Sequence, residues 1–84
     1  MLDLYYTVRS VTPGQKGRDA LTRAGLRCRL FRAPSATSER GCAYALALRQ
    51  ADGVRAAAVL ERAGVRVEGR WLRRPDGSFE RVGP

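Results

Sequence analysis

The sequence predicts an α+β domain, a ferredoxin-like βαββαβ sandwich in which a four-stranded antiparallel sheet carries two helices on one face. Residues 21–28 read LTRAGLRC and residues 60–67 read LERAGVRV, so the chain repeats one unit of helix end, Ala-Gly and strand. Two segments with helical spacing alternate with four segments of period-two spacing, in the order β-α-β-β-α-β. Two such units, each with one apolar helix face, are expected to share one sheet.

The first half begins with an aromatic strand predicted over residues 2–8. Thr12 is predicted to cap the helix that follows, because Pro13 suits a first helical turn and Gln15 can complete a capping box. The buried face of this helix is expected to contain small residues and one leucine, namely Gly17, Ala20, Leu21 and Ala24. Gly25 is predicted to end the helix in the left-handed conformation.

The second half follows the same design. Strands are predicted over 26–33 and 42–49, joined as a hairpin. Asp52 is predicted to cap the second helix, and Gly64 is predicted to end it. The buried face of this helix is expected to comprise Ala56, Val59, Leu60 and Ala63. A last strand is predicted over 65–72.

Residues 1–72 are therefore expected to form a single domain, followed by a tail over 73–84. The tail contains the turn sequence Pro75-Asp76-Gly77, which allows a short extra strand near 79–82. The longest uninterrupted apolar run is 42–48, far short of the roughly 18 residues that span a bilayer. We therefore expect a soluble, cytoplasmic protein without a membrane partner.

The composition excludes several classes of function. The chain has no histidine, which removes histidine-based catalysis and most zinc sites, and no metal or cofactor is expected. It has 16 Lys+Arg against 8 Asp+Glu, a net charge of +8, which favours nucleic acid, acidic protein surfaces or small anions as partners. Thiol chemistry and plain binding remain, and a carrier or accessory protein is expected rather than a stand-alone enzyme.

The two cysteines are predicted to differ. Cys28 alternates in phase with the leucines on either side and is expected to pack as a small buried hydrophobe. Cys42 has the phase of a buried strand residue too, but it lies at the edge of a loop, so both packing and chemistry remain open for it. A hairpin centred on residues 37 and 38 would pair Cys42 near Ala33 and Cys28 near Ala47, too far apart for a disulfide.

The surroundings of Cys42 favour an anion. Arg40 precedes it by two residues, and Arg32 ends the facing strand. Gly41 frees loop amides that can bind a thiolate or persulfide, and the hydroxyl of Ser38 can donate a further bond. The sequence therefore offers Cys42 as the candidate reactive residue.

The segment Ala33-Pro34 through Ser38 to Gly41-Cys42-Ala43-Tyr44 resembles the small domains of the Putative Se/S carrier protein-like family. The likeness extends over residues 4–72 and includes the proline-led loop that precedes a cysteine. Family members usually carry arginine and glycine where this chain has Ser35 and Ala43. The resemblance implies a carrier that holds sulfur or selenium on Cys42 and exchanges it with donor and acceptor proteins of the cysteine desulfurase type.

Two alternatives come from other classes of protein. The positive charge, with Tyr5, Phe31 and Arg29 on the open sheet face, is compatible with a small nucleic-acid or anion-binding module, although no RNP-like motif is present. The same open face, extended by Trp71 or Leu72, is also compatible with a structural or regulatory domain that forms a homodimer through its sheet.

Overall fold

The computed structural model describes residues 1–38 and 41–83. Its elements follow one another as β1 (Leu4–Val8), α1 (Val11–Arg23), β2 (Cys28–Arg32), β3 (Tyr44–Leu48), α2 (Gly53–Arg62), β4 (Gly69–Arg73) and β5 (Phe79–Gly83). Short 3₁₀ turns at Ser35–Thr37 and Gln50–Asp52 lie after β2 and before α2. In this part of the chain, no helix has the length and apolar character that crossing a membrane requires.

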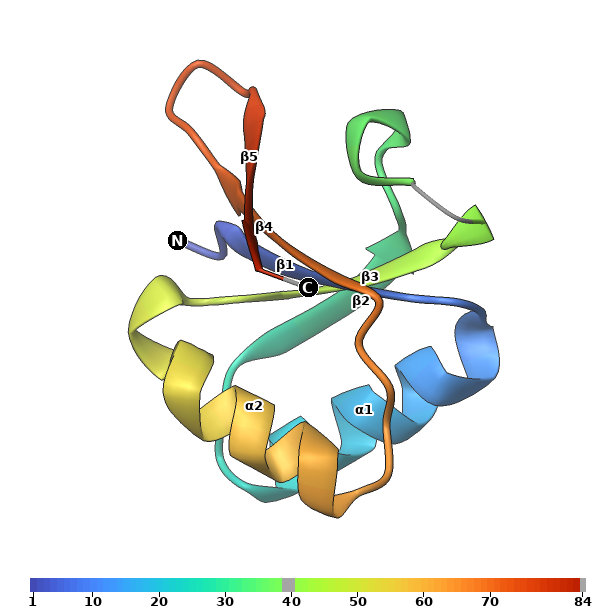
Figure 1. Ribbon diagram of the computed structural model, residues 1–84. Helices are drawn as coiled ribbons and strands as arrows, with labels where there is room; N and C mark the ends of the chain where they lie inside the picture. The colour runs from blue at the N-terminus through green and yellow to red at the C-terminus, as the bar shows by residue number, and fades with distance from the viewer. Residues whose placement is uncertain (39–40, 84) are drawn as a thin grey trace.

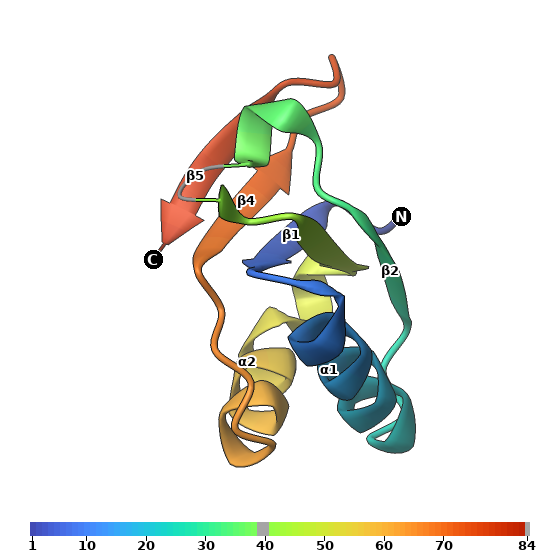
Figure 2. The ribbon, with the colours of Figure 1, turned by 90° about the vertical axis from the view of Figure 1, so that its right-hand side faces the viewer.

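The strands form one sheet in the order β2-β3-β1-β4-β5, and every neighbouring pair is antiparallel. Figure 1 shows α1 and α2 together on one face of this sheet, and Figure 2 shows the same arrangement from the side. The predicted α+β class, with two helices and an antiparallel sheet, is confirmed.

The prediction of four strands is wrong, because the tail adds β5 at the edge of the sheet beside β4. The turn 74–78 makes this return. Gly77 adopts a φ of +88°, which glycine tolerates without strain, and the amide of Arg74 donates to the carbonyl of Ser78 at 2.8 Å. The carboxylate of Asp76 accepts bonds from both the amide and the hydroxyl of Ser78.

Both helices end as the repeat predicts. Gly25 has a φ of +79° and Gly64 a φ of +74°. The amide of Leu26 donates to the carbonyl of Leu21, and the amide of Val65 donates to that of Leu60, both at 2.9 Å. These are the bonds of a glycine-ended helix, so the two predicted C-terminal caps are confirmed.

The helix starts differ from the prediction. α1 begins at Val11, with Ser10 in the cap position, so Thr12 lies inside the first turn and does not cap. Asp52 does occupy the cap position of α2, but its side chain makes no capping bond. Its carboxylate instead accepts a hydrogen bond from Nε of Arg49 at 3.0 Å.

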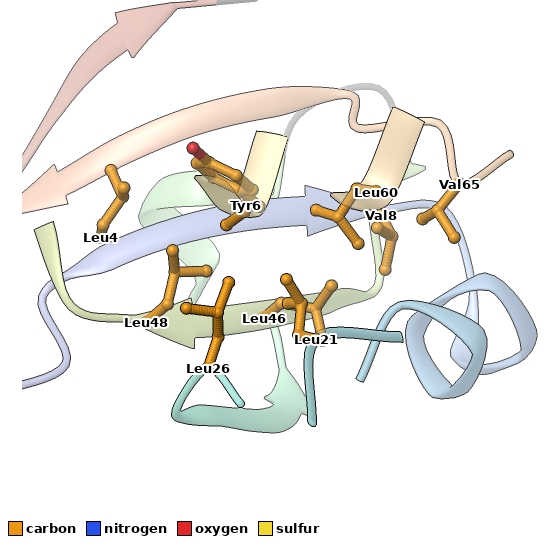
Figure 3. Packing of buried hydrophobic residues seen from close by; sticks show 10 residues of the cluster. Leu4, Tyr6, Val8, Leu21, Leu26, Leu46, Leu48, Leu60 and Val65 are labelled. Carbon is orange, nitrogen blue, oxygen red and sulfur yellow. The ribbon is translucent and has the colours of Figure 1, made fainter. Parts of the chain in front are cut away.

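The main core lies between the helices and the sheet, and Figure 3 shows its side chains meeting there. The fully buried members include Leu21 of α1, Leu60 of α2 and Leu46 of β3. Gly17 lets α1 approach closely, because a Cβ at that position would lie 2.8 Å from Cδ1 of Leu46 and 3.1 Å from Cδ2 of Leu60. The small residues on α1 therefore set the distance between helix and sheet.

A second apolar cluster covers the opposite face of the sheet and contains Tyr5, Ala45, Ala47 and Trp71 as its buried members. Phe79 of β5 packs against Tyr5, with ring centroids 5.0 Å apart. In Figures 1 and 2, the β4–β5 hairpin and the segment after β2 both rise from this face. The face is thus partly covered by the chain's own C-terminal strand.

Candidate functional site

The β2–β3 connection places Cys42 at the end of a loop, two residues before β3 begins at Tyr44. The predicted strand over 42–49 is therefore too long at its start. The predicted pairing is one residue out of register, because Cys28 lies opposite Leu48 rather than Ala47. Cys42 is only 2% exposed, so its thiol is buried beneath the loop in this conformation.

Several hydrogen bonds among the described residues hold this loop in place. The amide of Ala33 donates to the carbonyl of Ala43 at 2.8 Å and extends the hairpin by one pair. The carbonyl of Pro34 accepts both the amide and the hydroxyl of Thr37, at 2.9 and 3.0 Å, and Thr37 is fully buried. The hydroxyl of Ser38 donates to the carbonyl of Cys42 at 2.7 Å. Pro34 and Ser38 therefore fasten the loop, and the hydroxyl proton of Ser38 is engaged away from the sulfur.

A hollow of about 310 Å³ lies at the loop, and its lining brings several of the candidate residues together. It is lined by Arg32, Ala33, Ser35, Ser38, Gly41, Cys42 and Ala43. Gly41 adopts a φ of +76°, a conformation that side chains other than glycine strain to reach. Arg40, the second predicted cation, lies outside the described residues.

Arg32 has a fixed neighbour at the mouth of the loop. Its guanidinium carbon lies 5.6 Å from the ring centroid of Tyr44, which is its direct cross-strand partner in the β2–β3 ladder. A cation over an aromatic face is attracted by the ring quadrupole. Tyr44 therefore holds a positive charge beside the hollow that Cys42 also lines.

Cys28 lies far from this site, on β2, and both cysteines are free thiols. Leu48, its partner, is six residues along the chain from Cys42, so the two cysteines are about 20 Å apart at roughly 3.3 Å per residue. Burial raises the pKa of the Cys28 thiol to about 11, an effect that the nearby charge of Arg18 partly opposes. Cys28 is therefore protonated at neutral pH.

The sequence did not reveal what Thr37 and Tyr44 do. A threonine in a loop usually faces water, and nothing in the local pattern indicates that this one is buried with its hydroxyl on a carbonyl. Tyr44 and Arg32 are in contact because the hairpin register makes them direct cross-strand partners, whereas the register predicted from the sequence differs from it by one residue. Within residues 1–38 and 41–83, no group of three or more Cys, Asp or Glu side chains is arranged to hold a metal ion.

Comparison with known proteins gives one finding. The model of the family described as Putative Se/S carrier protein-like matches residues 3–72, which include both helices, β1 to β3, most of β4 and the whole cysteine loop. No curated protein and no solved structure matches the chain.

Proposed function

The chain belongs to the Putative Se/S carrier protein-like family, and on this premise we propose that Cys42 carries a sulfur or selenium atom between two partner proteins. The observation that carries the proposal is the position of Cys42. It lies in the loop that gives the chain its likeness to the family, and it lines a hollow with Arg32, Ser38 and Gly41.

The proposed loading step is a transfer between sulfur atoms. The Cys42 thiolate attacks the terminal sulfur of a persulfide on a donor of the cysteine desulfurase type. A bond forms between Sγ of Cys42 and that sulfur, the S–S bond of the donor breaks, and the donor cysteine leaves as a thiolate with the electron pair. The proton of the Cys42 thiol goes to solvent, and no external oxidant or reductant is needed. Delivery repeats this exchange with an acceptor.

The residues around the hollow suit an anionic cargo. The guanidinium of Arg32 supplies positive charge. The left-handed conformation of Gly41 leaves backbone amides of the loop outside the strand ladder, where they can donate hydrogen bonds to an anion. Arg40 is proposed to add a second charge. In a reducing cytoplasm, where we place the protein, Cys42 would remain available for loading.

The burial of Cys42 adds one requirement. A thiol that is 2% exposed cannot reach a donor cysteine, so the loop must open for loading. The bond from Ser38 to the carbonyl of Cys42 is then broken, and the Ser38 hydroxyl becomes free to donate to the incoming anion. We propose that docking of the partner drives this opening.

The test is sulfur transfer followed by mass spectrometry. The protein is incubated with a cysteine desulfurase and cysteine, and the mass of the intact chain is measured without reductant. We expect a gain of one sulfur atom in the wild type and in Cys28→Ser, and no gain in Cys42→Ser. A gain that persists in Cys42→Ser, or no gain in the wild type, contradicts the carrier function.

We also propose that residues 1–72 form the ferredoxin-like unit of the family and that 73–84 is an appended segment. The order β2-β3-β1-β4, with both helices on one face, supports this division, as does the end of the family match at residue 72.

A further inference from the structure

The face of the sheet opposite the helices contains a second hollow, of about 360 Å³. It is lined by Leu2, Tyr5, Arg29, Phe31, Ala47 and Arg73. None of these residues lines the hollow at Cys42, so the two sites are separate. Its volume lies near the lower end of the range for small-molecule sites, which suits one nucleotide rather than a dinucleotide.

The recess is produced by a difference in side-chain size. Ala47 of β3 lies between Arg29 of β2 and Tyr5 of β1 in the register of the sheet, so a small side chain is flanked by two large ones. Phe31 is half-buried, and its ring meets that of Tyr5 at 90°, with centroids 5.3 Å apart. Tyr5 is itself held from the other side by Phe79. The wall of the hollow is thus a fixed aromatic cluster with Phe31 at its open side.

Two cations border this aromatic wall from opposite sides. Arg29 is on β2 and Arg73 on β4, and β3 and β1 lie between these two strands. At roughly 4.8 Å between neighbouring strands, β2 and β4 are about 14 Å apart. Other arginines of the chain, at 18, 49, 66 and 74, form ion pairs with carboxylates. Within the described residues, the side chains of Arg29 and Arg73 form no ion pair or hydrogen bond. Their charges are available to a ligand.

We propose that this hollow binds single-stranded nucleic acid, with one base against Phe31 and the phosphates on either side of that nucleotide near Arg29 and Arg73. Aromatic rings stack on bases of any sequence, and arginines neutralise the backbone. A strand has a phosphate on both sides of each base, which matches two cations on opposite sides of one aromatic wall, whereas a mononucleotide uses only one of them. The net charge of +8 adds long-range attraction for a polyanion.

Fluorescence anisotropy with a labelled single-stranded RNA of mixed sequence tests the proposal across a salt series. We expect Phe31→Ala to weaken binding by about 5- to 150-fold, the range measured when base-stacking rings are removed. We expect Arg29→Gln with Arg73→Gln to reduce the steepness of log K against log salt by about 1.4, since each phosphate contact on a single strand contributes about 0.7.

The matched control removes the same charge from the helical layer. Arg23 and Arg62, in the last turns of α1 and α2, are exposed, and Arg23→Gln with Arg62→Gln should leave most of the affinity intact. If this control weakens binding as much as the Arg29 and Arg73 pair does, binding is diffuse and the proposal is overturned. Equal affinity for a free mononucleotide also overturns it, because the strand is then not required.

Two further variants keep the test decisive. Phe31→Leu retains an apolar side chain if Phe31→Ala fails to fold, and it should still lose the stacking contribution. Cys42→Ser should bind RNA like the wild type, because Cys42 lies in the other hollow. A loss of RNA binding in Cys42→Ser would contradict the separation of the two sites, while the result of the sulfur-transfer test does not depend on this one.

Discussion

Replacing Ser38 with alanine should expose Cys42 without unfolding the protein. The substitution removes the 2.7 Å hydrogen bond from the Ser38 hydroxyl to the carbonyl of Cys42. A neutral hydrogen bond contributes about 0.5–1.5 kcal/mol net, so the population with an open loop should rise by about 2- to 13-fold. If the loop closes faster than alkylation occurs, the alkylation rate of Cys42 follows this population and rises by the same factor.

The assay is alkylation by iodoacetamide under native conditions, with each cysteine followed separately by peptide mass spectrometry. Ser35→Ala is the matched control, because Ser35 lines the same hollow and no side-chain hydrogen bond holds it among the described residues. Ser38→Thr retains a hydroxyl and should restore the slow rate. Cys28 serves as the internal reference within the same molecule.

Two results would refute the reasoning. An unchanged Cys42 rate in Ser38→Ala would mean that this bond does not control access to the thiol. A parallel acceleration of Cys28 would mean that global unfolding, rather than opening of the loop, exposes both cysteines.

Three other predictions concern the fold and its titration. Gly17→Ala should lower the free energy of unfolding by up to about 2 kcal/mol in chemical denaturation, because overpacking against Leu46 and Leu60 costs about 1–3 kcal/mol and the better helix propensity of alanine returns about 1 kcal/mol. A stabilised variant would contradict the close packing of α1. Folding raises the pKa of the Cys28 thiol from 9.0 to about 11, so the thiol loses its proton at lower pH in the unfolded chain and the free energy of unfolding should fall between about pH 9 and 11. Melting curves of Cys28→Ala should show a smaller fall over this pH range, and a fall equal to that of the wild type would contradict the raised pKa. A chain ending at Arg73 lacks β5 and should keep its far-ultraviolet circular dichroism. The fluorescence emission of Trp71 should shift to the red, because this side chain is only 8% exposed and lies beside Arg81 of β5. Loss of folding would show that β5 is part of the essential domain.

The regular elements could be predicted because their signals are local. The Ala-Gly pairs that end each helix act through the φ of one glycine and bonds spanning five residues, and both ends lie where the repeat placed them. The strand phases followed from alternation, which correctly assigned Tyr5 and Phe31 to the face opposite the helices. The prediction left Trp71 and Leu72 as alternatives for this face, and the structure places Trp71 there. Leu72, by contrast, is the partner of Leu4 and belongs to the helix-covered side.

The edges of the elements were less predictable. The strand before Cys42 and the strand after it each begin later than the alternation indicates, because Leu26 and Cys42 are buried by tertiary packing without joining the ladder. β5 was foreseen only as an allowed extra strand, since a turn sequence permits a return but does not specify its partner. The partner is β4, and the ring contact between Tyr5 and Phe79 packs β5 against the sheet across more than seventy residues.

Composition, hydrophobic period and cap residues act over short distances, so the chain alone indicates the α+β class, the two glycine-ended helices, the positive charge and the likeness to one family. Three properties of the sites become visible only in the folded molecule: the Cys42 thiol is buried, Ser38 and Thr37 bind carbonyls, and Arg29 and Arg73 border one aromatic hollow. These properties depend on hairpin register and on which strands are neighbours. Both arise from contacts between residues distant in the chain, which no local pattern encodes.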